Sequence, residues 1–267
     1  MTYSYTQISQ YLRCPRSYRH RYLDDWREKE TRAAMLFGRC FEKALAAYFL
    51  REDSAAVLFK EWGAHREAQL EYSNADDWER LGRQGVQLLE RLAQDDRIRI
   101  RQPGRNLQVK LLRPLSTGND FVAYIDALGY LDGTRCLIEW KTTTSRYPEE
   151  PEGLLALDPQ LVCYSWMSGI SGVALVVFIR KRMPEIQYLR ASITRQQRQE
   201  FGQVVEQTIG QIEAGQFLPH SGIRFPQSGC VSCPYLGLCL GNQQLVEAKL
   251  VRQPGASDLD WLDLLDD

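Results

Sequence analysis

Apolar residues recur at helical spacing through the first third of the chain. A stripe through Ile8, Tyr11 and Leu12 predicts a short helix near the start, and Pro15 is placed to begin the next one. Longer stretches rich in Ala, Leu and Phe follow, with apolar positions three and four residues apart. Besides the first, the predicted helices cover Arg16–Leu23, Leu36–Leu50, Ala55–Leu70 and Trp78–Leu92.

The pattern then changes from helical spacing to alternation. Three stretches alternate apolar and polar positions or form short apolar runs, and turn sequences separate them at Gly118-Asn119-Asp120 and Asp132-Gly133-Thr134. Such a series predicts neighbouring antiparallel strands joined by tight turns. The predicted strands cover Leu107–Leu115, Phe121–Leu131 and Cys136–Trp140.

Helices and strands alternate in the part that follows. The predicted elements are a helix over Asp158–Met167, strands over Val173–Arg180 and Ile186–Ala191, and a polar helix over Thr194–Ala214 that ends at Gly215. This order predicts an α/β fold with one mixed central sheet flanked by helices. We expect a single domain over residues 1–254, with a mostly helical part at 1–95, an α/β core at 96–215 and a cysteine-bearing segment at 216–254.

Charge is distributed unevenly along the 267 residues. The net charge is −1, but the last thirteen residues, Gly255–Asp267, hold five aspartates and neither Lys nor Arg. The preceding body therefore has 33 basic and 29 acidic side chains, a net charge of +4, which permits nucleic-acid binding without requiring it. The acidic, amphipathic tail at 255–267 is expected to dock a protein partner or to cover a basic groove, and a frayed terminus is the alternative. Without a membrane-length apolar run or a signal peptide, we expect a cytoplasmic protein.

Two carboxylates and a lysine are the candidate catalytic group. Asp126 lies in the strand FVAYIDALGYL, and Glu139 and Lys141 lie in CLIEWKTTT after one tight turn. A spacing of two on a strand puts Glu139 and Lys141 on one face and Trp140 on the other, and a hairpin would bring Asp126 to the same place. Carboxylates suit Mg²⁺ or Mn²⁺, and a nearby ammonium would orient a water and stabilise charge on a phosphate. A cross-strand ion pair is the alternative explanation.

These residues resemble the core of the PD-(D/E)XK nucleases, which have a restriction-endonuclease-like α/β fold. In RecB-like members of that superfamily the next helix begins with Gln-x-x-x-Tyr, and this chain has Gln160 and Tyr164 in DPQLVCYSW. The resemblance implies that both line the site and contact the catalytic strand or the DNA backbone. Core packing is the alternative for Tyr164.

The resemblance also points to an upstream helix. RecB-like nucleases carry a Gly there and, four positions on, a metal-binding His. The segment FGRCFEKALAAYF has Gly38 and then Glu42, which departs from the family pattern. Glutamate is a good ligand for a hard cation, and other branches of the superfamily place one on this helix. We therefore expect Glu42 to assist as a metal ligand, with a surface glutamate as the alternative.

Four of the seven cysteines are candidate ligands of a second metal group. Cys230, Cys233 and Cys239 form C-x2-C-x5-C, a metal-binding pattern in a reducing compartment, and Cys14 is the natural fourth ligand. Four thiolates can hold zinc or a [4Fe–4S] cluster, and His220 is an alternative zinc ligand. The segments Cys-Pro-x-x-Tyr-x-x-x-Tyr and G-C-x-x-C-P-Y-x-x-x-C resemble the iron–sulfur branch of RecB-like nucleases, which includes the CRISPR-adaptation exonucleases and the nuclease domain of AddB. That resemblance favours [4Fe–4S] over Zn²⁺.

The function implied by the resemblance is metal-dependent hydrolysis of DNA. We expect an exonuclease that acts on single-stranded ends, in which Asp126, Glu139 and Glu42 bind Mg²⁺ or Mn²⁺, Lys141 activates water, and Gln160 and Tyr164 position the substrate. A structure-specific endonuclease and a non-catalytic DNA-binding subunit with a structural cluster are the alternatives.

Overall fold

The computed structural model describes residues 1–73, 76–220 and 228–255, so the acidic tail at 256–267 lies outside the described residues. The chain divides into two compact units. Unit 1 contains Met1–Glu30, Pro114–Phe121 and Gln203–Asp267, and unit 2 contains Thr31–Arg113 and Val122–Gly202. Each unit is described separately, and the single domain expected over 1–254 stays a prediction.

A mixed sheet forms the centre of unit 2, as the alternation of elements predicts. Four strands lie in the order β7 (Asp120–Leu131), β8 (Thr134–Thr143), β9 (Gly172–Ile179) and β10 (Glu185–Ser192). β8 is antiparallel to β7 and parallel to β9, and β10 is antiparallel to β9. The short strands β5 (Ile98–Arg99) and β6 (Leu107–Pro114) also pair with β7, and α6 (Pro103–Asn106) connects them.

The hairpin between β7 and β8 follows from its two turn residues. Asp132 and Gly133 have φ values of 49° and 77°, and Leu131 pairs with Thr134. Two consecutive residues with positive φ make the type I′ turn, whose twist matches that of the strands it joins. Asp and Gly reach this conformation at low cost, so the sequence fixes the register of the hairpin locally.

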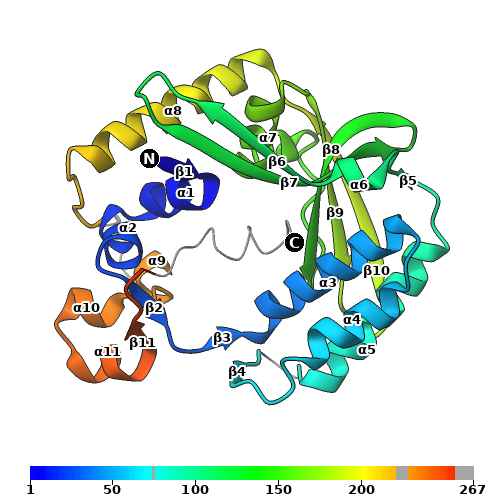
Figure 1. The fold of residues 1–267 in the computed structure, drawn as a ribbon, viewed down its shortest axis with the longest axis horizontal. Coiled ribbons are helices and arrows are strands. Elements are labelled where there is room, and N and C mark those ends of the chain that lie inside the picture. The colour runs from blue at the N-terminus through cyan, green and yellow to red at the C-terminus, as the bar shows by residue number, and fades with distance from the viewer. Residues whose placement is uncertain (74–75, 221–227, 256–267) are drawn as a thin grey trace. The chain divides into compact units, whose positions relative to one another are not determined.

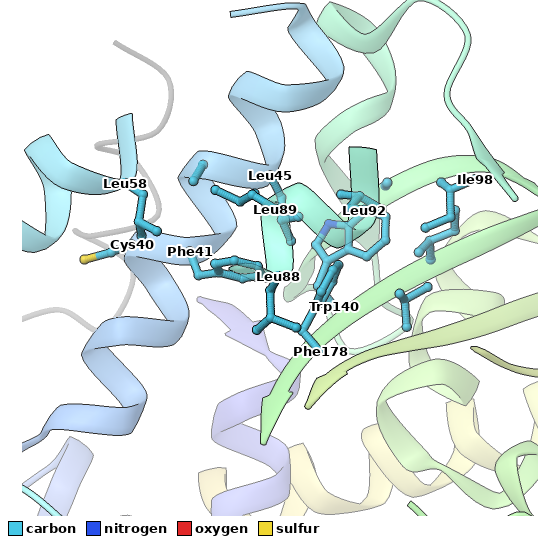
Figure 2. Close-up of a cluster of buried hydrophobic side chains, with 14 of the residues drawn as sticks. Cys40, Phe41, Leu45, Leu58, Leu88, Leu89, Leu92, Ile98, Trp140 and Phe178 are labelled. Carbon is cyan, nitrogen blue, oxygen red and sulfur yellow. The ribbon is translucent and has the colours of Figure 1, made fainter. Parts of the chain in front are cut away.

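Three helices cover one face of the sheet (Figure 1): α3 (Ala33–Leu50), α4 (Ser54–Gly63) and α5 (Trp78–Ala93). Their apolar stripes pack on Trp140 of β8 and Phe178 of β9 to form the main hydrophobic core of unit 2. Figure 2 shows Phe41 of α3 and Leu88 of α5 beside these two side chains. Burying several large side chains this way stabilises the sheet by roughly 1.5–3 kcal/mol for each one.

The helix predicted over Ala55–Leu70 was too long, because α4 ends at Gly63. Trp62 is the last buried position, and the polar residues that follow are exposed or half-buried. Without an apolar stripe to bury, a helix of this length gains little from continuing. The chain instead forms tight turns and then β4 (Leu70–Glu71), which pairs in parallel with β3 (Thr31–Arg32).

The remaining elements of unit 2 come after β8 in the chain. A short 3₁₀ helix at Leu154–Leu157 leads into α7 (Pro159–Ser168). Asp158 caps α7 by accepting hydrogen bonds from the backbone N–H groups of Gln160 (2.9 Å) and Leu161 (3.0 Å), and Gly169 ends it with a φ of 77°. A further helix, α8 (Arg195–Glu213), begins in unit 2 and continues into unit 1.

Unit 1 joins the two ends of the chain. It contains β1 (Thr2–Ser4), α1 (Tyr5–Arg13), α2 (Pro15–Tyr22) and β2 (Trp26–Glu28) from the N-terminal side. The C-terminal side contributes α9 (Ser228–Val231), α10 (Leu236–Leu240), α11 (Gln243–Lys249) and β11 (Leu250–Arg252). β11 pairs antiparallel with β2, which brings the C-terminal segment back onto the N-terminal one.

Aromatic rings and a capping box hold the N-terminal helices of unit 1. Ser4 and Gln7 form a capping box at the start of α1. The rings of Tyr11 and Tyr18 meet edge to face, and the Tyr11 hydroxyl donates to the carbonyl of Gln216 at 2.6 Å.

In the part of the chain that the structure describes, no helix has both the length and the apolar character needed to cross a membrane.

Candidate active site

The site is formed where β8 leaves β7 and continues along β9. Pairing between β7 and β8 extends to Ala127 and Ile138, and Asp126 is the next residue along β7. Its Oδ2 accepts a hydrogen bond from the backbone N–H of Trp140 at 2.7 Å. The Trp140 ring packs in the core against Phe49 and Phe178, so Glu139 and Lys141 lie on the other face of the strand, as their spacing predicts.

Helix α7 supplies two side chains to the same place. The Gln160 Nε2 donates to Glu139 Oε1 at 2.9 Å and to the Tyr164 hydroxyl at 2.7 Å. Lys141 Nζ donates to the Gln160 Oε1 at 3.1 Å and also to Glu139 Oε1. Gln160 therefore bridges the carboxylate and the ammonium, and the i, i+4 neighbour Tyr164 fixes the rotamer of Gln160. The structure brings together all four of these predicted residues.

Glu42 reaches the site from α3. Its side chain is half-buried, and its Oε1 accepts from Gln108 Nε2 at 2.6 Å. Its carboxylate is close enough to Asp126 to raise the pKa of that group. Gly38, one turn earlier, allows α3 to approach β8, because a Cβ there would lie only 3.3 Å from the Thr142 Oγ1. The glutamate that stands in place of the family histidine is thus half-buried and within electrostatic reach of Asp126 and Glu139, and its role as a metal ligand stays a prediction.

Gln108 is a residue of this site that the sequence did not indicate. It has a φ of 50°, a conformation that costs a side-chain-bearing residue of order 1 kcal/mol. The side-chain amide of this strained residue donates the hydrogen bond to Glu42, so a neutral donor lies against that carboxylate. The weak alternation of the surrounding strand is the only signal in the sequence, and it does not single out this position.

Three carboxylates close together make the site strongly negative. Burial, then Glu139 and then Glu42 raise the pKa of Asp126 well above its ordinary value. Burial also raises the pKa of Glu139, against the opposing effect of Lys141. For Lys141, burial lowers the pKa, but Glu139 more than offsets this effect, so the pKa is raised and the ammonium form is favoured. One ammonium is too little positive charge for three carboxylates.

The donor set can be compared with what a divalent cation requires. Glu139 is 3% exposed, and its Oε2 is buried without a hydrogen-bond partner among the residues that the structure describes. A buried carboxylate oxygen without a partner is costly, and a hard cation would satisfy it and relieve the repulsion between the carboxylates. Across residues 1–73, 76–220 and 228–255, however, no three His, Cys, Asp or Glu side chains are arranged as a formed metal site. The oxygen donors are of the type that such a cation binds, but their positions in this structure do not form a metal site.

The four cysteines of the second motif all lie in unit 1. Cys14 occupies the break between α1 and α2, where Pro15 disfavours a helical conformation for the preceding residue. Burial raises the pKa of the Cys233 thiol, and its electrostatic neighbours include Cys239 and Cys14. The Cys239 thiol likewise has Cys14 and Cys230 among its neighbours. These thiols are thus electrostatic neighbours within unit 1 and form no disulfide, but no three Cys, His, Asp or Glu side chains of the described residues are arranged as a metal site.

The other three cysteines behave as buried apolar residues. Cys40 and Cys136 belong to the core of unit 2, and burial raises both thiol pKa values to about 11. Cys163 is fully buried in α7. His220, the alternative ligand, has its Nδ1 3.2 Å from the carbonyl oxygen of Arg13, next to Cys14.

A mixed sheet with carboxylates and a lysine on two adjacent strands defines the class of this protein as an α/β nuclease. The model of the PD-(D/E)XK nuclease superfamily matches residues 2–240, and the chain belongs to that superfamily. A comparison with curated proteins finds no match.

Two solved structures resemble the fold at low sequence identity. A protein from Eubacterium rectale, described as a candidate exonuclease, is 13% identical with a TM-score of 0.49, over 84% of this chain and 90% of that one. The protein SSO0001 is 16% identical with a TM-score of 0.36, over 89% of this chain and 95% of that one. Both TM-scores lie below 0.5, so neither likeness bears on substrate or mode of cleavage.

Proposed function

We propose that this nuclease is a metal-dependent deoxyribonuclease that removes nucleotides from single-stranded DNA ends. The observation that carries the proposal is the convergence of Glu42, Asp126 and Glu139 beside Lys141, in a site whose negative charge exceeds its positive charge. A scaffold protein has no use for buried carboxylates that repel one another. Membership of the superfamily makes phosphodiester hydrolysis the chemistry that this arrangement serves.

Asp126 and Glu139 would hold Mg²⁺ or Mn²⁺, and Glu42 would assist them. The cation would supply Lewis-acid polarisation of the phosphate and lower the pKa of the attacking water. Asp126 is kept in place by the backbone N–H of Trp140, and Glu139 by Gln160 and Lys141. These contacts restrain both carboxylates before substrate arrives.

Lys141 acts in its protonated form. Glu139 outweighs burial and raises the pKa of Lys141, so we assign the ammonium form to orienting the water and stabilising negative charge on the phosphate. Gln160 holds the ammonium on the side of Glu139, and Tyr164 holds Gln160. Gln160 and Tyr164 are thus positioning residues for Lys141 and for the DNA backbone beside it.

A cleavage assay on end-labelled DNA tests the proposal. Purified protein is incubated with Mg²⁺ or Mn²⁺ and with single- and double-stranded substrates, each both linear and circular. We expect metal-dependent degradation of linear single strands from an end and little action on circles. Degradation of circular DNA would replace the exonuclease assignment with an endonuclease, and absence of metal-dependent cleavage on every substrate would refute the proposal.

We further propose that Cys14, Cys230, Cys233 and Cys239 bind a [4Fe–4S] cluster that links the two ends of unit 1. The gathering of the four thiols supports this ligand set, and the segments around Cys14 and Cys230 resemble the iron–sulfur branch of RecB-like nucleases. Thiols remain reduced in the cytoplasm, where we place the protein. A brown protein with about four irons per chain is the expected result, whereas a colourless protein with one zinc would assign the site to Zn²⁺.

The acidic tail at 255–267 is proposed to dock a partner or to cover basic surface. The support is its composition, five aspartates interleaved with leucines and Trp261. Deleting Gly255–Asp267 should change either activity or association with other proteins, and no change in either would dismiss the role.

A further inference from the structure

A buried glutamine on β10 forms hydrogen bonds that hold the loop after β8 in place. Gln187 is 3% exposed, although it lies on the outermost strand of the β7–β8–β9–β10 order. Its Oε1 accepts from the backbone N–H of Tyr147 at 2.9 Å, and its Nε2 donates to the carbonyl of Tyr147 at 2.9 Å. The same Nε2 donates to Glu149 Oε1 at 2.7 Å. The side-chain amide thus satisfies both backbone groups of one residue, as a neighbouring strand would.

The strand register places this fastening beside the active site. Lys141 of β8 pairs with Val177 of β9, and Val177 pairs with Gln187 of β10. Residues opposite one another on paired strands project to the same face, so Gln187 and Lys141 share a face of the sheet, two strands apart. That separation is about 10 Å between the two strand backbones. The phenol of Tyr147 does act electrostatically on Lys141.

Ion pairs also hold the residues around Tyr147 in place. The Arg146 guanidinium pairs with Glu149 and, at 3.2 Å, with Glu185 of β10. The backbone of Tyr147 is therefore fixed on both sides. The residue is nevertheless 38% exposed, which is high for a large aromatic residue held over a sheet. A fixed backbone with an accessible ring beside the catalytic lysine suits contact with a ligand better than core packing.

We propose that the Tyr147 ring stacks on a nucleobase of the single strand whose phosphate lies at Lys141, and that Gln187 is a positioning residue for Tyr147. Every base offers a π-face, so stacking holds a strand in register without selecting its sequence. The inference rests on the proposed function for its substrate. It adds a base contact to a site that otherwise offers only groups for the phosphate and the cation.

Substitution at Tyr147 tests the stacking. We expect Tyr147→Ala to raise the KM for a single-stranded oligonucleotide by roughly tenfold and to change kcat much less, while Tyr147→Phe stays within about twofold of wild type. An oligonucleotide with one abasic nucleotide near the cleaved end should bind wild type and Tyr147→Ala equally. Equal losses in the Phe and Ala variants, or a persisting difference on the abasic strand, would overturn the stacking.

Gln187→Ala tests the positioning role. The KM should rise as in Tyr147→Ala, and the double variant should be no worse than Tyr147→Ala alone, because Gln187 acts through that ring. Gln197→Ala is the matched control, since Gln197 is a half-buried glutamine that donates to the carbonyl of Ala156 at 2.8 Å, in the neighbouring 3₁₀ helix. We expect it to leave the KM unchanged. Additive losses in the double variant, or an equal effect of the control, would refute the role of Gln187.

Metal-free binding separates this inference from the proposed function. Fluorescence anisotropy in the presence of a chelator measures affinity for a labelled single strand without any cleavage. Tyr147→Ala should weaken that binding by roughly tenfold even if the wild-type chain cleaves nothing. Equal affinity of wild type and variant would overturn the inference, whatever the cleavage assay shows.

Discussion

The carboxylate site of unit 2 and the cysteine group of unit 1 differ in what holds their side chains in place. Around Glu139 and Lys141, hydrogen bonds come from β8 and α7, and the opposite face of β8 packs on a large core. The cysteines Cys230 and Cys239 lie on helices of four and five residues. In the part of the chain that the structure describes, the core beside them is small, with Tyr235, Val246 and Leu250 as its buried residues. Isolated helices this short are not stable in water.

The comparison shows two ways of building a functional site. In unit 2 the packing of the sheet fixes the polar side chains, so function can be removed there without unfolding the chain. In unit 1 the folded segment is small, and a bound cluster would supply much of the free energy that holds it. Substitutions at the two sites should therefore differ in kind: loss of rate at the first, loss of stability at the second.

The largest effect is expected at Lys141. Lys141→Ala should lower the cleavage rate by roughly 10²–10³-fold, because it removes the ammonium that stabilises charge on the phosphate. DNA affinity should change little, and the chain should stay folded because the core under β8 is untouched, with a lower melting temperature because Glu139 loses its ammonium partner. Single-turnover cleavage and anisotropy measure the two properties. Lys43→Ala removes an exposed lysine paired with Glu61 and serves as the control. Cleavage at the wild-type rate in Lys141→Ala would refute the assignment.

Cys233→Ser should affect stability before it affects catalysis. Loss of one ligand should release iron and destabilise unit 1, and a loss of about 3 kcal/mol would lower the melting temperature by roughly 6–12 °C. Iron content and thermal unfolding report the result. Cys136→Ala changes a cysteine in the core of unit 2 and should keep its iron. If the serine variant kept both its iron and its melting temperature, the contrast between the two sites would fail.

Substitutions at Glu42 distinguish a role as a metal ligand from a role in packing. Glu42→Ala should slow cleavage by about 10–100-fold, an effect smaller than that of Lys141→Ala because Asp126 and Glu139 remain. Glu42→His restores the residue type usual in RecB-like nucleases and should recover much of the rate. Metal-titration curves for the two variants distinguish weaker metal binding from a slower chemical step. Histidine no better than alanine would exclude a ligand role for Glu42.

Part of this site could be predicted from the sequence, because its signals are local. The spacing of Glu139 and Lys141, the Asp-Gly turn and the i, i+4 pair Gln160 and Tyr164 each depend on the geometry of one element or one hairpin. Gln108 and Gln187 could not be found this way. Their partners lie 66 and 40 residues away, and neither position breaks the pattern of its strand. Only the folded register brings them to the site.

The smallest change in stability is expected at Asp126, and it has the opposite sign. Without metal, burial and then repulsion from Glu139 and Glu42 disfavour the Asp126 carboxylate and raise its pKa. Asp126→Asn removes the charge and keeps an oxygen that can accept from the Trp140 backbone N–H. We therefore expect the variant to be inactive yet more stable by about 1 kcal/mol, or roughly 2–4 °C in melting temperature.

Adding Mg²⁺ or Mn²⁺ should reverse this order. The wild-type chain gains stability from a cation that binds only the folded state, and the asparagine variant gains less because it has lost a charged ligand. Thermal unfolding of both proteins, with chelator and with a metal series, measures the reversal. A wild-type chain that is more stable than Asp126→Asn even in chelator would show that the carboxylates are not in conflict, and the case for a cation between them would lose its main support.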